Sequence, residues 1–84
     1  MTYNGWKNYS TWNVWLWISN DPGYYWFAAE LAGQASSEHG LYRRFVDCLD
    51  LHRDLTPDGV HFLDSGLDYE ALDRYMFDLS EHDI

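Results

Sequence analysis

The sequence predicts an all-α fold, a compact bundle of four or five short helices, with an α+β fold containing a small strand pair as the alternative. Three observations predict it. Apolar residues recur at helical spacing, capping residues precede the expected helices, and 84 residues suffice for one domain only. Aromatic residues make up 19% of the chain, and each can bury roughly 150–250 Å². This apolar surface has to stabilise the fold without an internal disulfide, because Cys48 is the one cysteine.

The first helix is expected over residues 11–19, with Ser10 as its N-cap. Residues 1–9 contain Asn4-Gly5 and are expected to form an irregular arm or tight turn. A strand is the alternative for residues 11–19, because Trp, Val and Ile favour strands. The flanking capping residues favour a buried helix.

The second helix is expected over residues 22–35, with Asp21 as N-cap and Pro22 at the first helical position. The residues expected on its buried face are Tyr24, Phe27, Ala28, Leu31 and Ala35, widened by Tyr25, Trp26 and Ala29.

The third helix is expected over residues 38–53, after a loop at Ser36-Ser37. Its inward stripe is Leu41, Phe45, Cys48, Leu49 and His52. Its outward line, mostly carboxylate, is Arg43, Asp47, Asp50 and Asp54.

A short fourth helix is expected over residues 57–65, because Thr56-Pro57 repeats the cap-then-proline pattern and Gly66 stands where a helix C′ glycine would lie. The alternative is a short strand in which Val60 and Phe62 alternate inward. A last helix is expected over residues 69–80, capped by Asp68. Its inner stripe is Tyr69, Leu72, Met76 and Leu79.

Charge separates the chain into two halves. Residues 1–46 hold three acids, three bases and all five tryptophans, whereas residues 47–84 hold eleven acids and two bases, which accounts for the net charge of −9. We therefore expect a single domain, 1–84, in which the neutral half 1–46 builds the core and the acidic half 47–84 presents the working surface. A negative field of this kind attracts cationic protein surfaces, many of which hold nucleic acid.

The histidine and cysteine pattern predicts no catalytic residue, no metal site and no cofactor. Cys48 falls on the apolar stripe, where a cysteine behaves as a small hydrophobe. His52 with Asp54, or His61 with Asp64, would be isolated pairs. A small hydrolase that depends on His52 or His61 is the weakest of three functional hypotheses. Apolar stretches such as residues 14–18 are too short to cross a bilayer, and no secretory signal is visible, so a cytoplasmic location is expected.

The acidic half predicts a protein-binding surface instead. Carboxylates one helical turn apart are about 6 Å apart in rise, and one DNA strand carries a charge about every 3.4 Å, so two neighbouring acidic helices would approach the charge density of one strand. The residues expected to form this surface are Asp47, Asp50, Asp54, Asp58, Asp64, Glu70, Asp73, Asp78 and Glu81. The alternative is an adaptor domain that binds a protein partner through exposed aromatics such as Trp6 or Trp15, its acids serving solubility only.

The N-terminal run over residues 3–14, Y-N-G-W-K-N-Y-S-T-W-N-V, continues into Leu16-Trp17-Ile18 and Asn20-Asp21. It resembles the opening motif of a family of small proteins from phages and mobile elements, over about a quarter of the chain. The resemblance implies a setting of anti-defence proteins, including anti-CRISPR and anti-restriction proteins that mimic DNA. Position 15 is Trp where a small residue such as alanine is expected, which implies a repacked core or an added exposed aromatic contact.

Taken with the charge pattern, this setting leads us to expect an anti-CRISPR DNA mimic that blocks DNA or PAM binding. Its partner would be a basic nucleic-acid-binding host protein, a CRISPR effector or a restriction enzyme, in the host cytoplasm. No direct binding to nucleic acid or membrane is expected, and the protein would be a monomer or a weak dimer.

Overall fold

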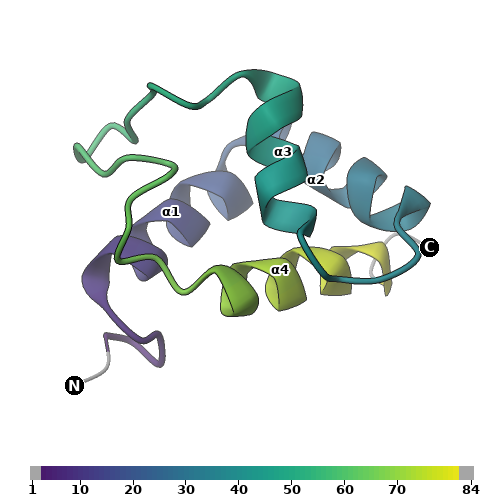
Figure 1. Ribbon diagram of the computed structural model, residues 1–84, viewed down its shortest axis with the longest axis horizontal. Coiled ribbons are helices and arrows are strands. Elements are labelled where there is room, and N and C mark those ends of the chain that lie inside the picture. The colour runs from purple at the N-terminus through teal and green to yellow at the C-terminus, as the bar shows by residue number, and fades with distance from the viewer. Residues whose placement is uncertain (1–2, 82–84) are drawn as a thin grey trace.

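The computed structural model describes residues 3–81, which form four α-helices and a terminal 3-10 turn (Figure 1). In chain order these are α1 (Tyr9–Asn20), α2 (Pro22–Gln34), α3 (Leu41–Leu49), α4 (Tyr69–Asp78) and η1 (Leu79–Glu81). Within these residues there are two isolated β-bridges, Tyr3–Trp6 and Leu55–His61, and no strand. The all-α prediction is confirmed, and the α+β alternative is wrong.

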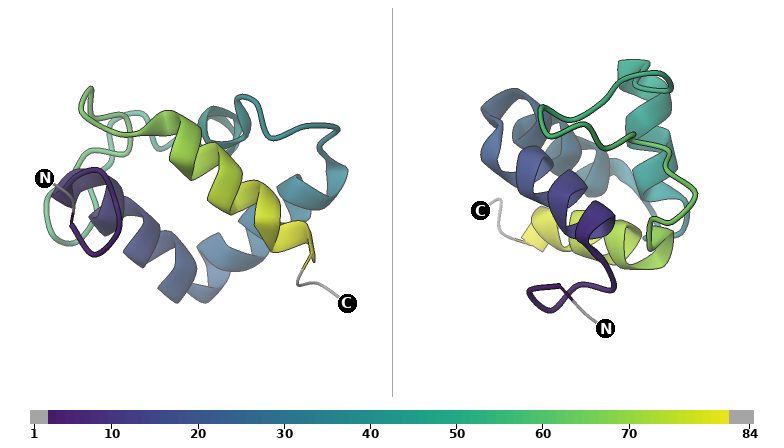
Figure 2. Two further views of the ribbon diagram at one scale, coloured as in Figure 1. Left: turned by 90° about the horizontal axis from the view of Figure 1, so that it is seen from below. Right: turned by 90° about the vertical axis from the view of Figure 1, so that its left-hand side faces the viewer.

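Helix α2 is the central element, because it packs against α1, α3, α4 and η1. Helix α3 stands steeply above α4, and the irregular residues 50–68 pass beside α1 in each of the views (Figures 1 and 2). The radius of gyration is 11.9 Å, close to the roughly 12 Å of a compact domain of this length. The four helices therefore form one compact globule. None of the helices in the described part of the chain is long and apolar enough to cross a membrane.

Helix α1 begins two residues earlier than expected. Its N-cap is Asn8, whose Oδ1 accepts hydrogen bonds from the backbone N of Thr11 (2.9 Å) and from Thr11 Oγ1 (2.7 Å), so Ser10 lies inside the first turn. The predicted Asn4-Gly5 turn is confirmed, since Tyr3 and Trp6 exchange two backbone hydrogen bonds around it. The helix prediction for residues 11–19 is confirmed as well.

One residue, Asp21, separates α1 from α2 and serves both helices. Its backbone N donates to the carbonyl of Trp17 (3.0 Å), and this bond closes the last turn of α1. Its Oδ1 accepts from the backbone N of Tyr24 at the start of α2 (3.1 Å). The predicted cap with Pro22 at the first helical position is confirmed. On α2, however, Trp26 is 63% exposed instead of buried.

Helix α3 is much shorter than the predicted 38–53. Its backbone leaves the helix at Asp50, which adopts a left-handed conformation (φ 55°). His52 therefore lies beyond the helix and is exposed, and Cys48 also faces solvent, so both predictions of an inward position are wrong. Tyr42 and Val46 complete the buried stripe with Leu41 and Phe45 instead.

Residues 50–68 form an irregular segment, so the predicted helix over 57–65 is wrong. Gly59 has a positive φ of 88°, and Thr56 and Val60 bond to each other through the backbone (2.8 Å), which closes a turn where the helix was expected. The backbone N of Gly66 bonds to Asp64 Oδ1 (2.7 Å), so Gly66 does not end a helix. Val60 and Phe62 are both buried, as the strand alternative required, but only the Leu55–His61 bridge forms there.

Helix α4 confirms the last predicted helix. Asp68 Oδ1 accepts from the backbone N of Ala71 (3.2 Å) as N-cap, and Leu72, Met76 and Leu79 are buried. The helix start is also fastened to α1, because the backbone N of Asp68 donates to Thr11 Oγ1 (3.0 Å).

Both halves of the chain build the core, contrary to the expectation that the neutral half would supply it. The core cluster combines Val14, Ile18, Ala28, Ala29, Leu31, Ala32, Leu41, Tyr42, Phe45 and Val46 with Leu51, Val60, Phe62, Leu67, Leu72, Met76 and Leu79. None of the five tryptophans, all of which lie in the described residues, is fully buried. Trp15 packs half-buried with Trp6 (ring centroids 6.2 Å) and Tyr75 (6.0 Å), and this cluster holds the N-terminal arm against α1 and α4.

Candidate functional site

Three of the predicted surface carboxylates are engaged in holding the fold together. Asp73 is the clearest, since only 9% of it is exposed. From α4, its Oδ2 accepts from the backbone N of Gly40 (3.0 Å) and its Oδ1 from the backbone N of Tyr42 (2.8 Å). These groups belong to the first turn of α3, where Gly40 has no side chain to cap them. Asp73 thus caps a neighbouring helix and is not part of an acidic surface.

Asp58 is the second such carboxylate, and it joins the irregular segment to α1. Its Oδ2 accepts from Asn13 Nδ2 (2.7 Å) and Trp17 Nε1 (2.9 Å). Both bonds stabilise the ionised form, and they hold the pKa of Asp58 below its ordinary value. The buried Asn13 also accepts from Thr56 Oγ1 (2.7 Å), so two residues of the segment are fastened to one α1 side chain.

Asp64 is the third. Its Oδ1 accepts the backbone N–H of Gly66 within its own turn, and its backbone carbonyl accepts from Tyr69 Oη (2.8 Å). The side chain is half-buried. We therefore assign structural roles to Asp58, Asp64 and Asp73. The sequence does not distinguish these three acids from the other acids of residues 47–84.

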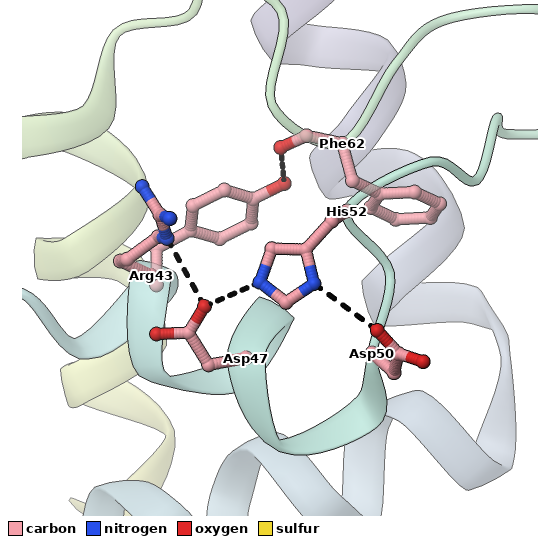
Figure 3. Close-up of polar contacts among 6 residues, drawn as sticks. Arg43, Asp47, Asp50, His52 and Phe62 are labelled. Carbon is pink, nitrogen blue, oxygen red and sulfur yellow. Dashed lines mark hydrogen bonds and ion pairs between the residues drawn. The ribbon is translucent and has the colours of Figure 1, made fainter.

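Asp47, Asp50 and Asp54 remain exposed and lie together where α3 ends; we call these three the α3-end cluster. Asp47 Oδ1 accepts from Arg43 Nε (3.1 Å) and lies 2.6 Å from His52 Nε2, and Asp50 Oδ1 lies 3.2 Å from His52 Nδ1 (Figure 3). A surface depression beside them is lined by Asp50, His52, Arg53 and Asp54. The predicted outward line along one helix is interrupted, because the helix ends before Asp50.

The hydrogen bonds of this cluster shift two pKa values in opposite directions. The bond from His52, followed by that from Arg43, holds the pKa of Asp47 below its ordinary value. The bonds to Asp47 and then to Asp50 raise the pKa of His52. Both shifts favour the charged forms of the two residues.

Asp21 belongs to the neutral half of the chain and caps α2 as predicted. Burial first, and then the charges of Asp21 and Asp54, raise the pKa of Tyr24 on α2. One acid of each half of the chain therefore contributes to the negative field at this tyrosine.

The other predicted carboxylates lie on α4 and its extension. Glu70 and Asp78 are exposed at opposite ends of α4, and Glu81 lies in η1, outside the residues whose side chains the structure describes. Glu38 pairs with Arg74 of α4 at 3.9 Å. A second hollow is lined by Glu38, His39, Tyr69, Glu70 and Asp73. The acids of the second half are thus distributed over several elements. The members of the α3-end cluster are linked by the contacts of His52 and by the depression that Asp50 and Asp54 line.

The histidines and the cysteine are placed apart. His61 is exposed in the irregular segment, and Cys48 is exposed on α3. Among residues 3–81, no three His, Cys, Asp or Glu side chains come together in a way that could hold a metal ion. His52 is the one histidine bonded to carboxylates within that range.

Comparison with known proteins adds one finding. Residues 1–82 match the model of a family of unknown function, DUF7249. No curated protein and no solved structure matches the chain.

Proposed function

The chain belongs to the DUF7249 family of unknown function, and we propose that it is a binding protein whose α3-end cluster occupies a cationic, nucleic-acid-binding surface of another protein. In its specific form, the proposal is an inhibitor of a CRISPR effector or a restriction enzyme that acts in the host cell by excluding DNA. The phage setting comes from the resemblance of the N-terminal motif.

The observation that carries the proposal is where Asp47 and Asp50 stand. Both lie at the C-terminal end of α3, where the helix dipole is negative and further negative charge is unfavourable. Asp50 also adopts a left-handed conformation, at a position where helices usually place glycine. At Asp50, neither the charge nor the residue type suits the stability of the helix, whereas the bonds from Arg43 and His52 offset the charge of Asp47. Carboxylates at such positions are expected where a function other than folding requires them.

The charge balance of the whole chain agrees with this interpretation. A net charge of −9 with few bases disfavours a phosphate backbone as the partner and favours a protein surface rich in Lys and Arg. Burial and then the charges of Asp21 and Asp54 raise the pKa of Tyr24, so the field at the start of α2 is negative as well. Asp73 and Asp64 are at least half-buried, and Asp58 is bonded to two side chains of α1, so these three acids are engaged in the fold. Within residues 3–81, in contrast, the carboxylates of Asp47 and Asp50 bond only to the exposed side chains of Arg43 and His52 beside them.

The test compares two triple charge reversals of equal size. One is Asp47→Lys/Asp50→Lys/Asp54→Lys, and the matched control is Glu30→Lys/Glu70→Lys/Asp78→Lys, whose residues are also exposed. Each protein is added to a purified CRISPR effector or restriction enzyme, and binding of that enzyme to its DNA is followed by gel shift at low and high salt. We expect the cluster triple to lose inhibition and the control triple to keep most of it. Inhibition should fade as the Debye length falls from about 10 Å at 0.1 M salt to about 3 Å at 1 M.

Two results would contradict the proposal: full inhibition by the cluster triple, or equal losses in the two triples. Circular dichroism of each variant is the control for folding, and a retained helical signal is required before the two losses of inhibition are compared. The equal losses would indicate that net charge matters and that the α3-end cluster has no special role.

A second candidate function, an adaptor that uses exposed aromatics, is favoured by Trp26. This side chain is 63% exposed on α2, and large apolar side chains at protein surfaces are enriched in binding sites. Trp6 and Trp15, which the sequence alone favoured for this role, are half-buried, because their rings pack on each other and on Tyr75. The adaptor interpretation predicts that Trp26→Ala removes capture of a host protein and that capture does not depend on salt.

A further inference from the structure

His52 lies between two carboxylates, with one ring nitrogen directed at each. Its Nε2 is 2.6 Å from Asp47 Oδ1 and its Nδ1 is 3.2 Å from Asp50 Oδ1 (Figure 3). A carboxylate only accepts hydrogen bonds, and a neutral imidazole carries one N–H. Both contacts can therefore be hydrogen bonds only while His52 is protonated.

We propose that His52 is a proton-operated switch on the α3-end cluster, which joins Asp50 to Asp47 when protonated and releases Asp50 for a cationic partner when neutral. This inference rests on the proposed function of that cluster. The step is a proton exchange with water: protonated His52 loses the proton on Nδ1 and keeps the one on Nε2.

The geometry identifies Asp50 as the residue that is released. Its contact with His52 is the longer of the two, and its side chain is 93% exposed. Among the described side chains, Asp50 makes no other hydrogen bond, whereas Asp47 Oδ1 also accepts from Arg43 Nε. Loss of the proton thus leaves Asp47 held by Arg43 and frees the carboxylate of Asp50.

The other charged groups around His52 determine the direction of the effect. On α3, Arg43 bonds to Asp47, which in turn contacts His52. Beyond the helix, Arg53 and Asp54 line the same surface depression as His52. From α2, Tyr24 interacts with the charge of Asp54, since burial first, and then the charges of Asp21 and Asp54, raise its pKa. The bonds to Asp47 and Asp50 raise the pKa of His52, so protonation extends to higher pH than for an isolated histidine. Deprotonation makes the cluster more negative by one unit, so a cationic partner binds the neutral form more tightly.

The first experiment follows the ring of His52 by long-range ¹H–¹⁵N NMR during a pH titration. In the wild-type protein, the neutral form should be the tautomer that keeps hydrogen on Nε2. Asp47→Asn and Asp50→Asn should each lower the pKa of His52, with the larger change for Asp47→Asn. The same pKa in all three proteins, or a neutral form with hydrogen on Nδ1, would overturn the switch.

The second experiment measures binding of a nona-arginine peptide by calorimetry across the range in which histidine titrates, about pH 5 to 8. Wild-type affinity should rise by about two- to fivefold as His52 loses its proton, the range expected for one exposed charge pair. His52→Gln should bind with nearly the same affinity at every pH, and His61→Gln, an exposed histidine outside the cluster, should keep the wild-type dependence.

The outcomes separate the two proposals. A pH dependence that persists in His52→Gln would overturn the switch and leave the binding function intact. A peptide that binds at no pH, or equally well to the Asp47→Lys/Asp50→Lys/Asp54→Lys triple, would overturn the binding function. The NMR titration would still decide whether the hydrogen-bond exchange occurs.

Discussion

At the scale of single residues, identical side chains perform opposite tasks. Asp73 and Asp78 are both aspartates of α4. Asp73 is buried and accepts hydrogen bonds from backbone N–H groups at the start of α3, whereas Asp78 is exposed. Burial of a carboxylate is tolerated only where hydrogen bonds replace the lost water. The two N–H groups at the start of α3 provide those bonds, and they would themselves be unsatisfied without Asp73.

Replacing Asp73 with Asn tests this role. The amide keeps one acceptor oxygen and turns an NH₂ group toward a backbone N–H, so one buried donor loses its partner. We expect the free energy of unfolding to fall by about 1–3 kcal/mol. The control is Asp78→Asn, an exposed site where a change within about 0.5 kcal/mol is expected. Urea denaturation followed by circular dichroism measures both, and equal small losses would show that Asp73 is no cap.

At the scale of elements, α3 ends in a Schellman motif with an aspartate in the glycine position. The backbone N of Leu51 bonds to the carbonyl of Val46 (3.0 Å), and that of Asp50 bonds to the carbonyl of Asp47 (3.3 Å). Leu51 and Val46 are both buried, as expected of the apolar residues that flank this motif. The left-handed residue between them is Asp50.

Asp50→Gly should therefore stabilise the protein. Glycine adopts a positive φ without the steric cost of a Cβ atom, and the change removes a negative charge from the negative end of the helix. We expect a gain of about 1 kcal/mol in the free energy of unfolding, measured by thermal and urea denaturation above the pKa of His52. Asp54→Gly, where φ is not positive, should be neutral or destabilising. A loss of stability in Asp50→Gly would show that the left-handed conformation of Asp50 has no steric cost that glycine relieves.

The sequence was sufficient to predict those helices whose boundaries are encoded locally. Asp21-Pro22 and Asp68 are caps next to the turns that they serve, and α2 and α4 begin where expected. The boundaries of α3 and the absence of a helix at 57–65 were not predictable in this way. Asp73 caps α3 from 33 residues away, and Asp58 bonds to Asn13 across 45 residues, so both depend on the finished tertiary structure.

The candidate site divides in the same manner. Asp47 and Asp54 were predicted as exposed acids from helical spacing, and they are exposed, although the helix that justified the prediction ends between them. The hydrogen bonds of His52 were not predicted from the sequence. They form because the chain reverses direction at Asp50, which brings the His52 ring back over the end of α3.

At the scale of the whole molecule, the two halves of the chain are joined by polar side chains as well as by the core. Thr56 and Asp58 bond to Asn13, and the Trp17 indole donates to Asp58. These bonds attach the irregular segment to α1 where no backbone ladder does so. Two of these three bonds therefore depend on the ionisation of one carboxylate, that of Asp58.

Acid should weaken this attachment. The pKa of Asp58 is lower in the folded protein than in the unfolded chain, so its stabilising contribution is complete above the unfolded pKa of about 3.9 and is lost as the pH falls through the folded value. The stability difference between wild type and Asp58→Asn should be constant near neutral pH and vanish in acid. Urea denaturation at a series of pH values measures it, and a difference that persists unchanged below the folded pKa would contradict the assignment.

The attachment of late residues to α1 also determines the order in which a growing chain can fold. Asn8 Nδ2 donates to the carbonyl of Gly66 (2.7 Å), and Thr11 Oγ1 accepts from the backbone of Asp68, across 58 and 57 residues. During synthesis, α1 and α2 can pair soon after they leave the ribosome, because their contacts are local. The first turn of α1 cannot make these bonds until nearly the whole chain has been translated. The oldest part of the nascent chain is therefore among the last to reach its native contacts.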